Sequence, residues 1–108
     1  MSRIKKPNLT NQKCVYRAVK IFGDKWTPLI VQTLAKKTSR FCEIQKEVGG
    51  INPRTLSLRL SHLEEEGIIK KTIYSEVPLH SDYKLTLKGN DLLPILKSMA
   101  AWGEKYRR

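Results

Sequence analysis

The stretch INPRTLSLRLSHLEEEG, residues 51–67, constrains the fold more than any other part of the chain. Leu56, Leu60 and Leu63 recur at the spacing of a helix and predict one buried stripe. The opposite side of this helix carries hydrogen-bonding groups and one aliphatic side chain, which an ordinary surface helix would not need. The residues on that side are Arg54, Ser57, Leu58 and Ser61. The pattern therefore predicts a helix with a core on one side and a binding partner on the other.

The periodicity of apolar residues predicts the order of elements along the rest of the chain. Helices are expected over residues 10–22, 25–37, 42–48 and 53–66. The pattern then changes to segments rich in β-branched and aromatic residues at 68–74 and 82–87, which predict a hairpin with a long loop at 75–81. A last helix is expected over residues 88–108, with a kink at Pro94.

Capping and turn residues support these boundaries. Asp24 is placed to cap the second helix, and Asn52 with Pro53 is typical of the start of the fourth. The glycines at 49–50 end the third helix and allow a tight turn, and Thr86 is a candidate cap for the last helix. The predicted fold is mainly α with a small β-hairpin (α+β), and the order of elements is that of a winged helix-turn-helix.

The charge of the chain indicates the kind of partner. Lys and Arg number 21 against 10 Asp and Glu, so the net charge is +11. An excess of this size favours polyanions such as nucleic acid or an anionic membrane surface, although a basic solvated surface is the simpler alternative. No apolar run approaches the ~20 residues of a membrane span, and no secretory signal precedes the first helix. A cytoplasmic, nucleoid-associated protein without membrane contact is therefore expected.

Residues 1–9 are interpreted as a basic N-terminal arm, followed by one domain over residues 10–108. Positive residues continue to Lys20, and no acidic residue occurs before Asp24. The arm would lie near phosphate in one interpretation and would be a frayed, solvated end in the other.

Four motifs give the chain a family resemblance. They are KW at 25–26, RF.EI at 40–44, I.PRTLS.RL..LEE.GI from 51, and Y.EVP…Y.LT..G from 74. With these motifs the sequence resembles the HxlR-type branch of the MarR-like bacterial transcription regulators, from about Cys14 to Gly103. The resemblance implies a homodimer on double-stranded DNA with a roughly palindromic operator. It also implies that the fourth helix reads the major groove, that the hairpin is the wing, and that repression is the expected outcome.

The terminal helices are expected to form the dimer contact. The resemblance implies this arrangement, and the last helix has apolar residues over too wide an arc for burial against one small domain. The residues expected at this interface are Val15, Val19, Leu92, Leu96, Met99 and Trp102.

The outer side of the fourth helix is the predicted base-reading surface. Arg54 lies near the N-terminus of the helix and can grip guanine O6 and N7 together. Ser57 and Ser61 can bond phosphate or bases, and Leu58 can meet a thymine methyl group. The alternative for Leu58 is contact with a neighbouring helix or simple exposure.

A second group of polar and basic residues is expected to bind phosphate. Its members are Lys25, Thr55, Arg59, Lys70, Lys71 and His80. Lys71 and His80 occupy wing positions where relatives favour arginine, and lysine keeps the charge without the two-pronged donor. Arg59 alternatively forms an ion pair with Glu66 or another acid, and the wing lysines alternatively give the strand its polar side.

The two cysteines are candidate sites of redox regulation. They are too few for a zinc site or a disulfide framework, so no metal and no cofactor is expected. Cys14 is expected in the first turn of its helix, where the dipole and the nearby Lys13 and Arg17 favour a thiolate. Some members of the resembled family sense oxidants or electrophiles at such a cysteine. Cys42 would share this chemistry or pair with Cys14, and the alternative is that both are inert small apolar groups.

Other classes of function have weaker support. A small RNA-binding protein would need exposed aromatic residues for stacking, whereas the Tyr and Phe residues here follow the fold pattern. A winged helix that docks a protein partner remains a further alternative. An enzyme is not expected, because His62 and His80 have no carboxylate or nucleophile at a telling spacing and no phosphate-binding glycine loop is present.

Overall fold

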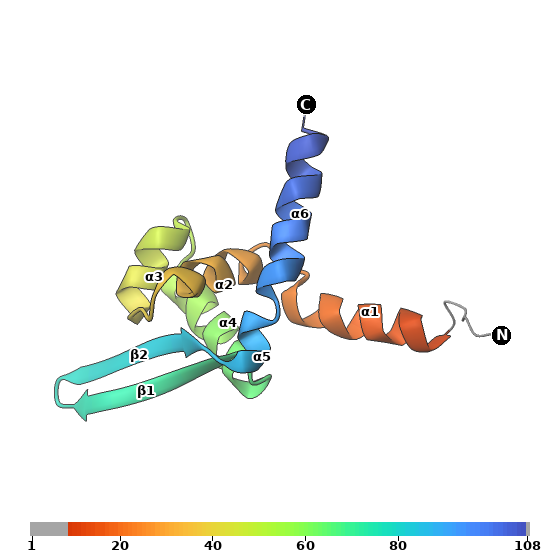
Figure 1. The fold of residues 1–108 in the computed structure, drawn as a ribbon. Helices are drawn as coiled ribbons and strands as arrows, with labels where there is room; N and C mark the ends of the chain where they lie inside the picture. The colour runs from red at the N-terminus through yellow and green to blue at the C-terminus, as the bar shows by residue number, and fades with distance from the viewer. Residues whose placement is uncertain (1–8, 108) are drawn as a thin grey trace.

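The computed structural model describes residues 9–107 and shows a winged helix-turn-helix (Figure 1). The elements in chain order are α1 (Leu9–Phe22), α2 (Thr27–Lys36), α3 (Phe41–Val48), α4 (Pro53–Glu65), β1 (Ile69–Glu76), β2 (Leu79–Leu85), α5 (Leu87–Asn90) and α6 (Leu93–Lys105). The predicted class, mainly helical with one antiparallel hairpin, is confirmed. The predicted basic arm lies outside the described residues except for Leu9, which already belongs to α1.

The predicted helix starts are formed by side-chain hydrogen bonds to free backbone amides. The Asp24 carboxylate accepts from the amides of Trp26 and Thr27 ahead of α2. The Asn52 side chain accepts from the Thr55 amide at 2.8 Å and begins α4. Between α3 and α4 the chain turns through Gly49 and Gly50, whose φ angles of 72° and 76° are unfavourable for any other residue. The capping residues predicted from the sequence therefore lie at the starts of α2 and α4, although α2 begins at Thr27, two residues later than predicted.

The C-terminal part differs from the predicted single kinked helix. Thr86 caps the four-residue α5, where its hydroxyl accepts from the Gly89 amide at 3.1 Å. The chain then turns and begins α6, with Pro94 in the first turn. Pro94 does not kink a helix, because amides in the first turn have no intrahelical partner and the proline ring costs nothing there.

The hairpin is longer than predicted. The segment at 75–81 was expected to be a loop, but β1 and β2 extend through most of it and leave only Val77 and Pro78 at the turn. Strand residues pair from Ile69 with Leu85 to Glu76 with Leu79, and the register shifts beside Tyr74. Between α2 and α3 the chain also forms a short antiparallel bridge, from Ser39 to Tyr83 of β2.

The core lies between α2, α3, α4 and the base of the hairpin. Leu56, Leu60 and Leu63 are fully buried, as the helical stripe predicted, and each contributes about 1.5–3 kcal/mol of burial free energy. The remaining core positions are Ile30, Val31, Leu34, Ile44, Ile51, Ile68, Ile69, Tyr83 and Leu96. None of the helices in the described part of the chain has the length and apolarity of a membrane span.

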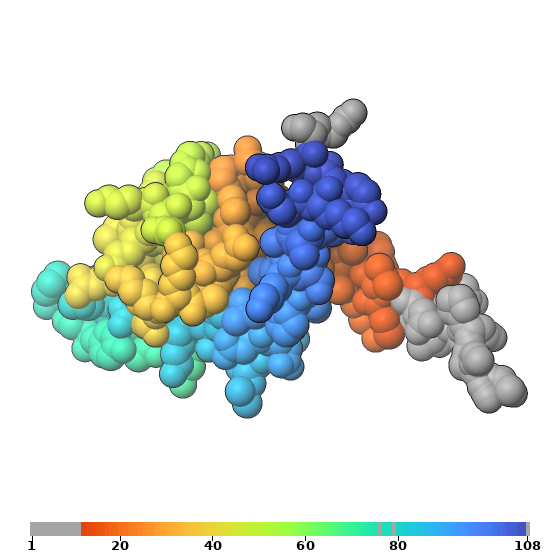
Figure 2. Space-filling model, turned by 45° about the horizontal axis from the view of Figure 1, so that its top comes forward, coloured from red at the N-terminus to blue at the C-terminus, as the bar shows by residue number. Residues whose placement is uncertain are grey.

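Two helices extend from this core. Figure 1 shows α1 and α6 leaving the body in different directions, and Figure 2 shows α1 reaching away from the packed elements. The radius of gyration is 16.4 Å, whereas a compact domain of about 100 residues has a value of about 13 Å. The subunit therefore extends most of α1 and the C-terminal part of α6 beyond its own core (Figure 1).

Candidate nucleic-acid interface

The outer side of α4 is a continuous exposed surface. Arg54, Ser57, Leu58 and Ser61 are all exposed, while the opposite side of the helix is buried. Leu58 is 61% exposed, so the neighbouring-helix contact considered for it is absent from the subunit. The structure therefore brings all four predicted base-reading residues onto one free face.

Arg59 lies at the edge of this face and is half-buried. Its Nη1 donates to Asp24 Oδ2 at 3.2 Å, so the guanidinium is held by a carboxylate in the loop between α1 and α2. We expected Arg59 to hold phosphate, with an ion pair to Glu66 or another acid as the alternative. The structure shows the ion pair, and the acid is Asp24, which lies 35 residues earlier in the chain.

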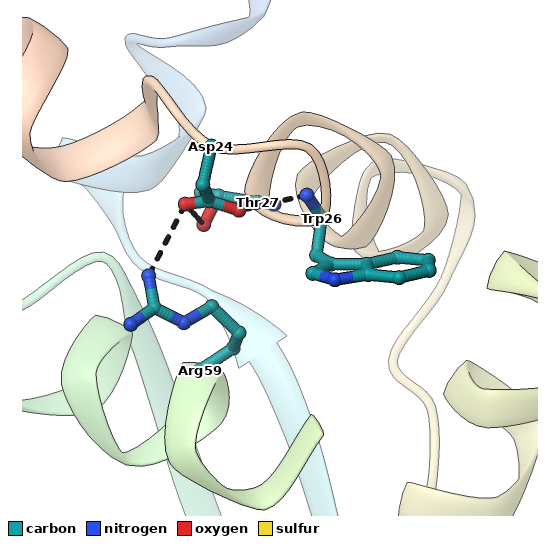
Figure 3. A network of polar contacts seen from close by, with 4 residues as sticks. All are labelled: Asp24, Trp26, Thr27 and Arg59. Atoms are coloured by element: carbon teal, nitrogen blue, oxygen red, sulfur yellow. Dashed lines mark hydrogen bonds and ion pairs between the residues drawn. The ribbon is translucent and has the colours of Figure 1, made fainter. Parts of the chain in front are cut away.

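The Asp24 carboxylate is surrounded by donors (Figure 3). Oδ1 accepts from the amides of Trp26 and Thr27, each at 2.7 Å, and Oδ2 also accepts from the Thr27 hydroxyl at 2.6 Å. Partial burial alone would raise the pKa of Asp24, but the bonds from Thr27 and Trp26 and the charge of Arg59 outweigh it and lower the pKa below its usual value. Asp24 is therefore a charged, fixed acceptor at neutral pH.

Lys25 is exposed at the start of α2, and its Nζ lies 4.7 Å from the centre of the Trp26 ring. We expected Lys25 to bind phosphate, and the free amides at a helix start such as that of α2 can bind phosphate as well. Two of those amides, of Trp26 and Thr27, already donate to Asp24. Lys25 thus remains a candidate for phosphate binding through its charge. The amides of Trp26 and Thr27 are already paired with Asp24 and are not candidates.

Two lysines face outward on the wing, and only one of them, Lys70, was predicted from the sequence to bind phosphate. Lys70 and Lys84 are directly opposite each other across the hairpin, and both are exposed. Like charges in such a pair destabilise the hairpin unless an anion lies between them. Lys84 was missed because its position opposite Lys70 depends on the strand register. Lys71 is half-buried instead, with its Nζ 5.8 Å from the Tyr83 ring centre.

His80 and Tyr74 pack against each other near the end of the hairpin. Their rings meet edge to face with centroids 6.1 Å apart, and His80 is half-buried. The charge of Asp82, followed by some desolvation and a hydrogen bond from Tyr74 to Asp82, raises the pKa of the Tyr74 hydroxyl. Tyr74 therefore contacts other side chains of the wing, although 62% of its surface is exposed.

The cysteines lie on different helices and are both exposed and free. Cys42 is in the first turn of α3, as expected. Cys14 is not in the first turn of its helix, because α1 begins at Leu9 and Cys14 follows five residues later. The dipole effect is confined to the first turn, so the argument for thiolate at Cys14 loses this component.

The predicted dimer residues separate into two groups. Val15, Val19, Met99 and Trp102 are exposed on α1 and α6, and Trp102 is 68% exposed. Leu96 is only 6% exposed and belongs to the subunit's own core, so its assignment to the interface is wrong. Leu92 is partly buried against the same core. Three further exposed apolar residues, which the sequence did not single out, lie on these helices or directly after α6, namely Tyr16, Ile95 and Tyr106. Helical spacing of Ile95 with Met99, Trp102 and Tyr106 was the available signal.

A family model described as HxlR-like helix-turn-helix matches residues 21–108. The chain belongs to this family. HxlR-like proteins of known sequence include an uncharacterized HTH-type transcriptional regulator of Methanothermobacter thermautotrophicus. That protein is 39% identical over 89 residues, which cover 82% of this chain and 68% of the relative.

Solved structures agree with this HxlR-like assignment. The redox regulator HypR in its reduced form superposes with a TM-score of 0.81 at 33% identity, covering 86% of this chain and 92% of that chain. The reduced form of the transcriptional regulator YodB from B. subtilis gives 0.77 at 30% identity, covering 86% and 91%. The chain is therefore a transcriptional regulator with a DNA-binding helix-turn-helix of the MarR-like winged type. Within residues 9–107, no three His, Cys, Asp or Glu side chains gather as a metal site would need.

Proposed function

We propose that the protein acts as a homodimer on a two-fold-symmetric DNA site, with α4 of each subunit in the major groove. The exposed outer face of α4 carries this proposal, since Arg54, Ser57, Leu58 and Ser61 are free while the inner stripe is buried. An α-helix fits the major groove, where guanine and thymine offer targets to arginine and to an aliphatic side chain. A DNA-bound regulator of this kind is expected with the nucleoid, and repression is the expected outcome of its binding.

The phosphate contacts in this proposal come from the two sides of α4. Lys70 and Lys84 project from the wing, and Lys25 projects from the start of α2. These contacts carry no base information, but they fix the orientation of α4 in the groove. A protein-docking function would use the same face with little salt dependence, whereas DNA binding through lysines depends strongly on salt.

Dimerisation would join the subunits through α1 and α6. Val15, Tyr16 and Val19 are exposed on α1, and Met99 and Trp102 are exposed on α6. Exposed apolar surface on two projecting helices is typical of a subunit interface. A two-fold dimer would place two α4 helices about one DNA turn apart, ~34 Å, or a multiple of it.

Substitution of Arg54 tests the base-reading role. The preferred duplex is first selected from random sequence by the wild-type protein, and a scrambled duplex of the same composition serves as the reference. Arg54→Ala should lose about 1–3 kcal/mol of discrimination between the two duplexes, because arginine grips guanine through two hydrogen bonds. Lys70→Ala should instead weaken binding to both duplexes and lower the salt slope by about one. Equal weakening of both duplexes by Arg54→Ala would contradict base reading.

Redox control is a second proposal, favoured by the likeness to HypR, which is described as a redox regulator. Cys14 is exposed on α1, the helix proposed at the dimer interface, so its oxidation or alkylation would alter the spacing of the two recognition helices. Wild-type protein should lose operator binding in peroxide or quinone, and Cys14→Ser should retain it. Cys42→Ser tests whether the second thiol takes part. Wild-type binding that is indifferent to peroxide and to quinones would eliminate sensing by either cysteine.

A further inference from the structure

We propose that Asp24 is a positioning residue for sequence recognition, because its carboxylate fixes the rotation of α4 about its own axis through Arg59. The inference rests on the proposed role of α4 as the base-reading helix. Asp24 itself lies in the loop before α2 and belongs to none of the surfaces assigned above to base reading.

The carboxylate is a rigid anchor. Four donors converge on it, of which three come from Trp26 and Thr27 at the start of α2. Thr27 is completely buried, so this end of α2 is set into the core. The fourth donor is Arg59, whose bond to Asp24 therefore ties α4 to a fixed point of the fold (Figure 3).

Arg59 occupies a position on α4 from which a bond to the body of the subunit restrains rotation, in addition to the buried leucine stripe. It lies between exposed Leu58 and buried Leu60, on the boundary between the outer face and the core stripe. The ion pairs of the described residues otherwise join α2 to α3 or lie at the end of α6. Within residues 9–107, the Asp24–Arg59 pair is thus the ion pair that connects α4 to another element.

The rotation matters because base contacts are short. Side chains extend to a radius of about 5–6 Å from a helix axis, so a rotation of about 10° moves a contacting atom by about 1 Å. A shift of that size takes a hydrogen bond out of its favourable range of distance and angle. Arg54, Ser57 and Ser61 would lose register with their bases together, although none of them contacts Asp24.

The negative charge of Asp24 lets positioning be distinguished from simple electrostatics by the direction in which DNA affinity changes. A carboxylate beside a DNA-binding surface repels phosphate, so simple electrostatics predicts tighter binding when its charge is removed. Positioning predicts weaker binding to the preferred sequence. The two effects therefore move operator affinity in opposite directions.

Asp24→Asn is the appropriate variant. Asparagine is as good an N-cap as aspartate, so its carbonyl oxygen can still accept from the Trp26 and Thr27 amides. Its amide group presents donors to the Thr27 hydroxyl and to Arg59, and a donor cannot bond the guanidinium. The variant keeps the start of α2 and breaks the link to α4. Glu47→Gln is the matched control. Glu47 also forms an ion pair, with Lys36 at 2.7 Å, but this pair joins α3 to α2 and does not involve α4.

The experiment measures the ratio of affinities for the duplex selected by wild-type protein and for its scrambled counterpart, with folding checked by circular dichroism. Asp24→Asn should lower this ratio about tenfold, the scale of one lost base contact, while scrambled-duplex affinity stays equal or rises. Glu47→Gln should leave the ratio unchanged. Arg59→Gln should lower the ratio as well, and adding Asp24→Asn to it should cause no further loss, because both changes remove the same link.

Three results would overturn the inference: an unchanged or higher ratio in Asp24→Asn, an equal fall in Glu47→Gln, or additive losses in the double variant. Arg54→Ala is measured in the same assay to distinguish base reading by α4 from the positioning role of Asp24. If Arg54→Ala lowers the ratio and Asp24→Asn does not, only the positioning role fails. If neither lowers it, α4 does not read bases and the positioning role fails with it.

Discussion

Trp102→Glu is expected to dissociate the protein into monomers and to weaken binding to the full two-fold DNA site by about 100-fold or more. A glutamate in an apolar subunit contact leaves an unpaired charge where Trp102 offers a large exposed ring beside Tyr106, with the ring centroids 5.3 Å apart and the planes tilted by 47°. Once the subunits separate, two recognition helices no longer bind as one unit, and the gain from bivalent binding, about 10²–10⁴, is lost. Analytical ultracentrifugation and titration of full-site and half-site duplexes measure the two effects.

Leu87→Glu provides the control for subunit association. Leu87 is even more exposed, at 86%, but it lies on α5 and outside the proposed interface. It should leave the oligomeric state unchanged. Trp102→Glu should also keep wild-type affinity for an isolated half-site, because α4 and the wing are untouched. A Trp102→Glu protein that stays dimeric, or a wild-type protein that is monomeric at micromolar concentration, would rule out the proposed interface.

Gly89→Ala is expected to lower the free energy of unfolding by about 3 kcal/mol, the upper part of the range for overpacked sites. A Cβ at this buried position would lie 2.2 Å from the Ile68 carbonyl oxygen and 3.1 Å from Leu85 Cδ2. The Ile68 oxygen accepts from both the amide and the hydroxyl of Thr86, so its displacement breaks the bonds between the base of the wing and α5. Thermal unfolding should show a fall in melting temperature of more than about 10 °C.

Gly103→Ala is the matched control for the backbone effect of the substitution. Gly103 is also helical, but a Cβ there meets no atom within 4 Å. Alanine should stabilise the protein slightly, by about 0.5–1 kcal/mol, because it restricts the unfolded chain more than glycine does. If Gly89→Ala behaves like Gly103→Ala, the backbone around Ile68 yields without cost and the tight packing has no energetic consequence.

The helix-turn-helix was predictable because local rules determine it. Leu56, Leu60 and Leu63 follow helical spacing, and Asn52 accepts the bond that its position at a helix start predicts. The hairpin was only partly predictable. The segment at 75–81 contains a proline and polar residues that favour a loop, whereas cross-strand pairing continues the strands to Glu76 and Leu79.

The residues of the candidate site were predictable where their role depends only on which face of a single helix they occupy. Arg54, Ser57, Leu58 and Ser61 share a face by helical geometry alone. Other roles depend on tertiary contacts that one sequence does not contain. Arg59 pairs with an acid 35 residues away, and Lys84 becomes relevant only through the strand register.

The apolar residues of α6 illustrate the same limit. Leu96 and Met99 lie on one helix with similar hydrophobicity, yet Leu96 is in the subunit core and Met99 is half-exposed. Periodicity shows that the helix is apolar over a wide arc, but the neighbours on each side decide which part of the arc faces the subunit's own core. The prediction that Cys14 lies in the first turn of its helix was wrong for a simpler reason. The helix α1 begins at Leu9, earlier than the capping residues suggested.

The core is built almost entirely without α1. Every buried apolar residue of the core in the described chain comes from α2 or later, and Ile21, in the last turn of α1, is partly buried against this core. In the proposed dimer, substitutions at the exposed positions of α1, such as Val15 and Val19, should therefore change how tightly two copies bind each other and leave the fold of each copy intact. A regulator arranged in this way can have the concentration at which it engages its genes reset by single residue changes, with no loss of thermal tolerance.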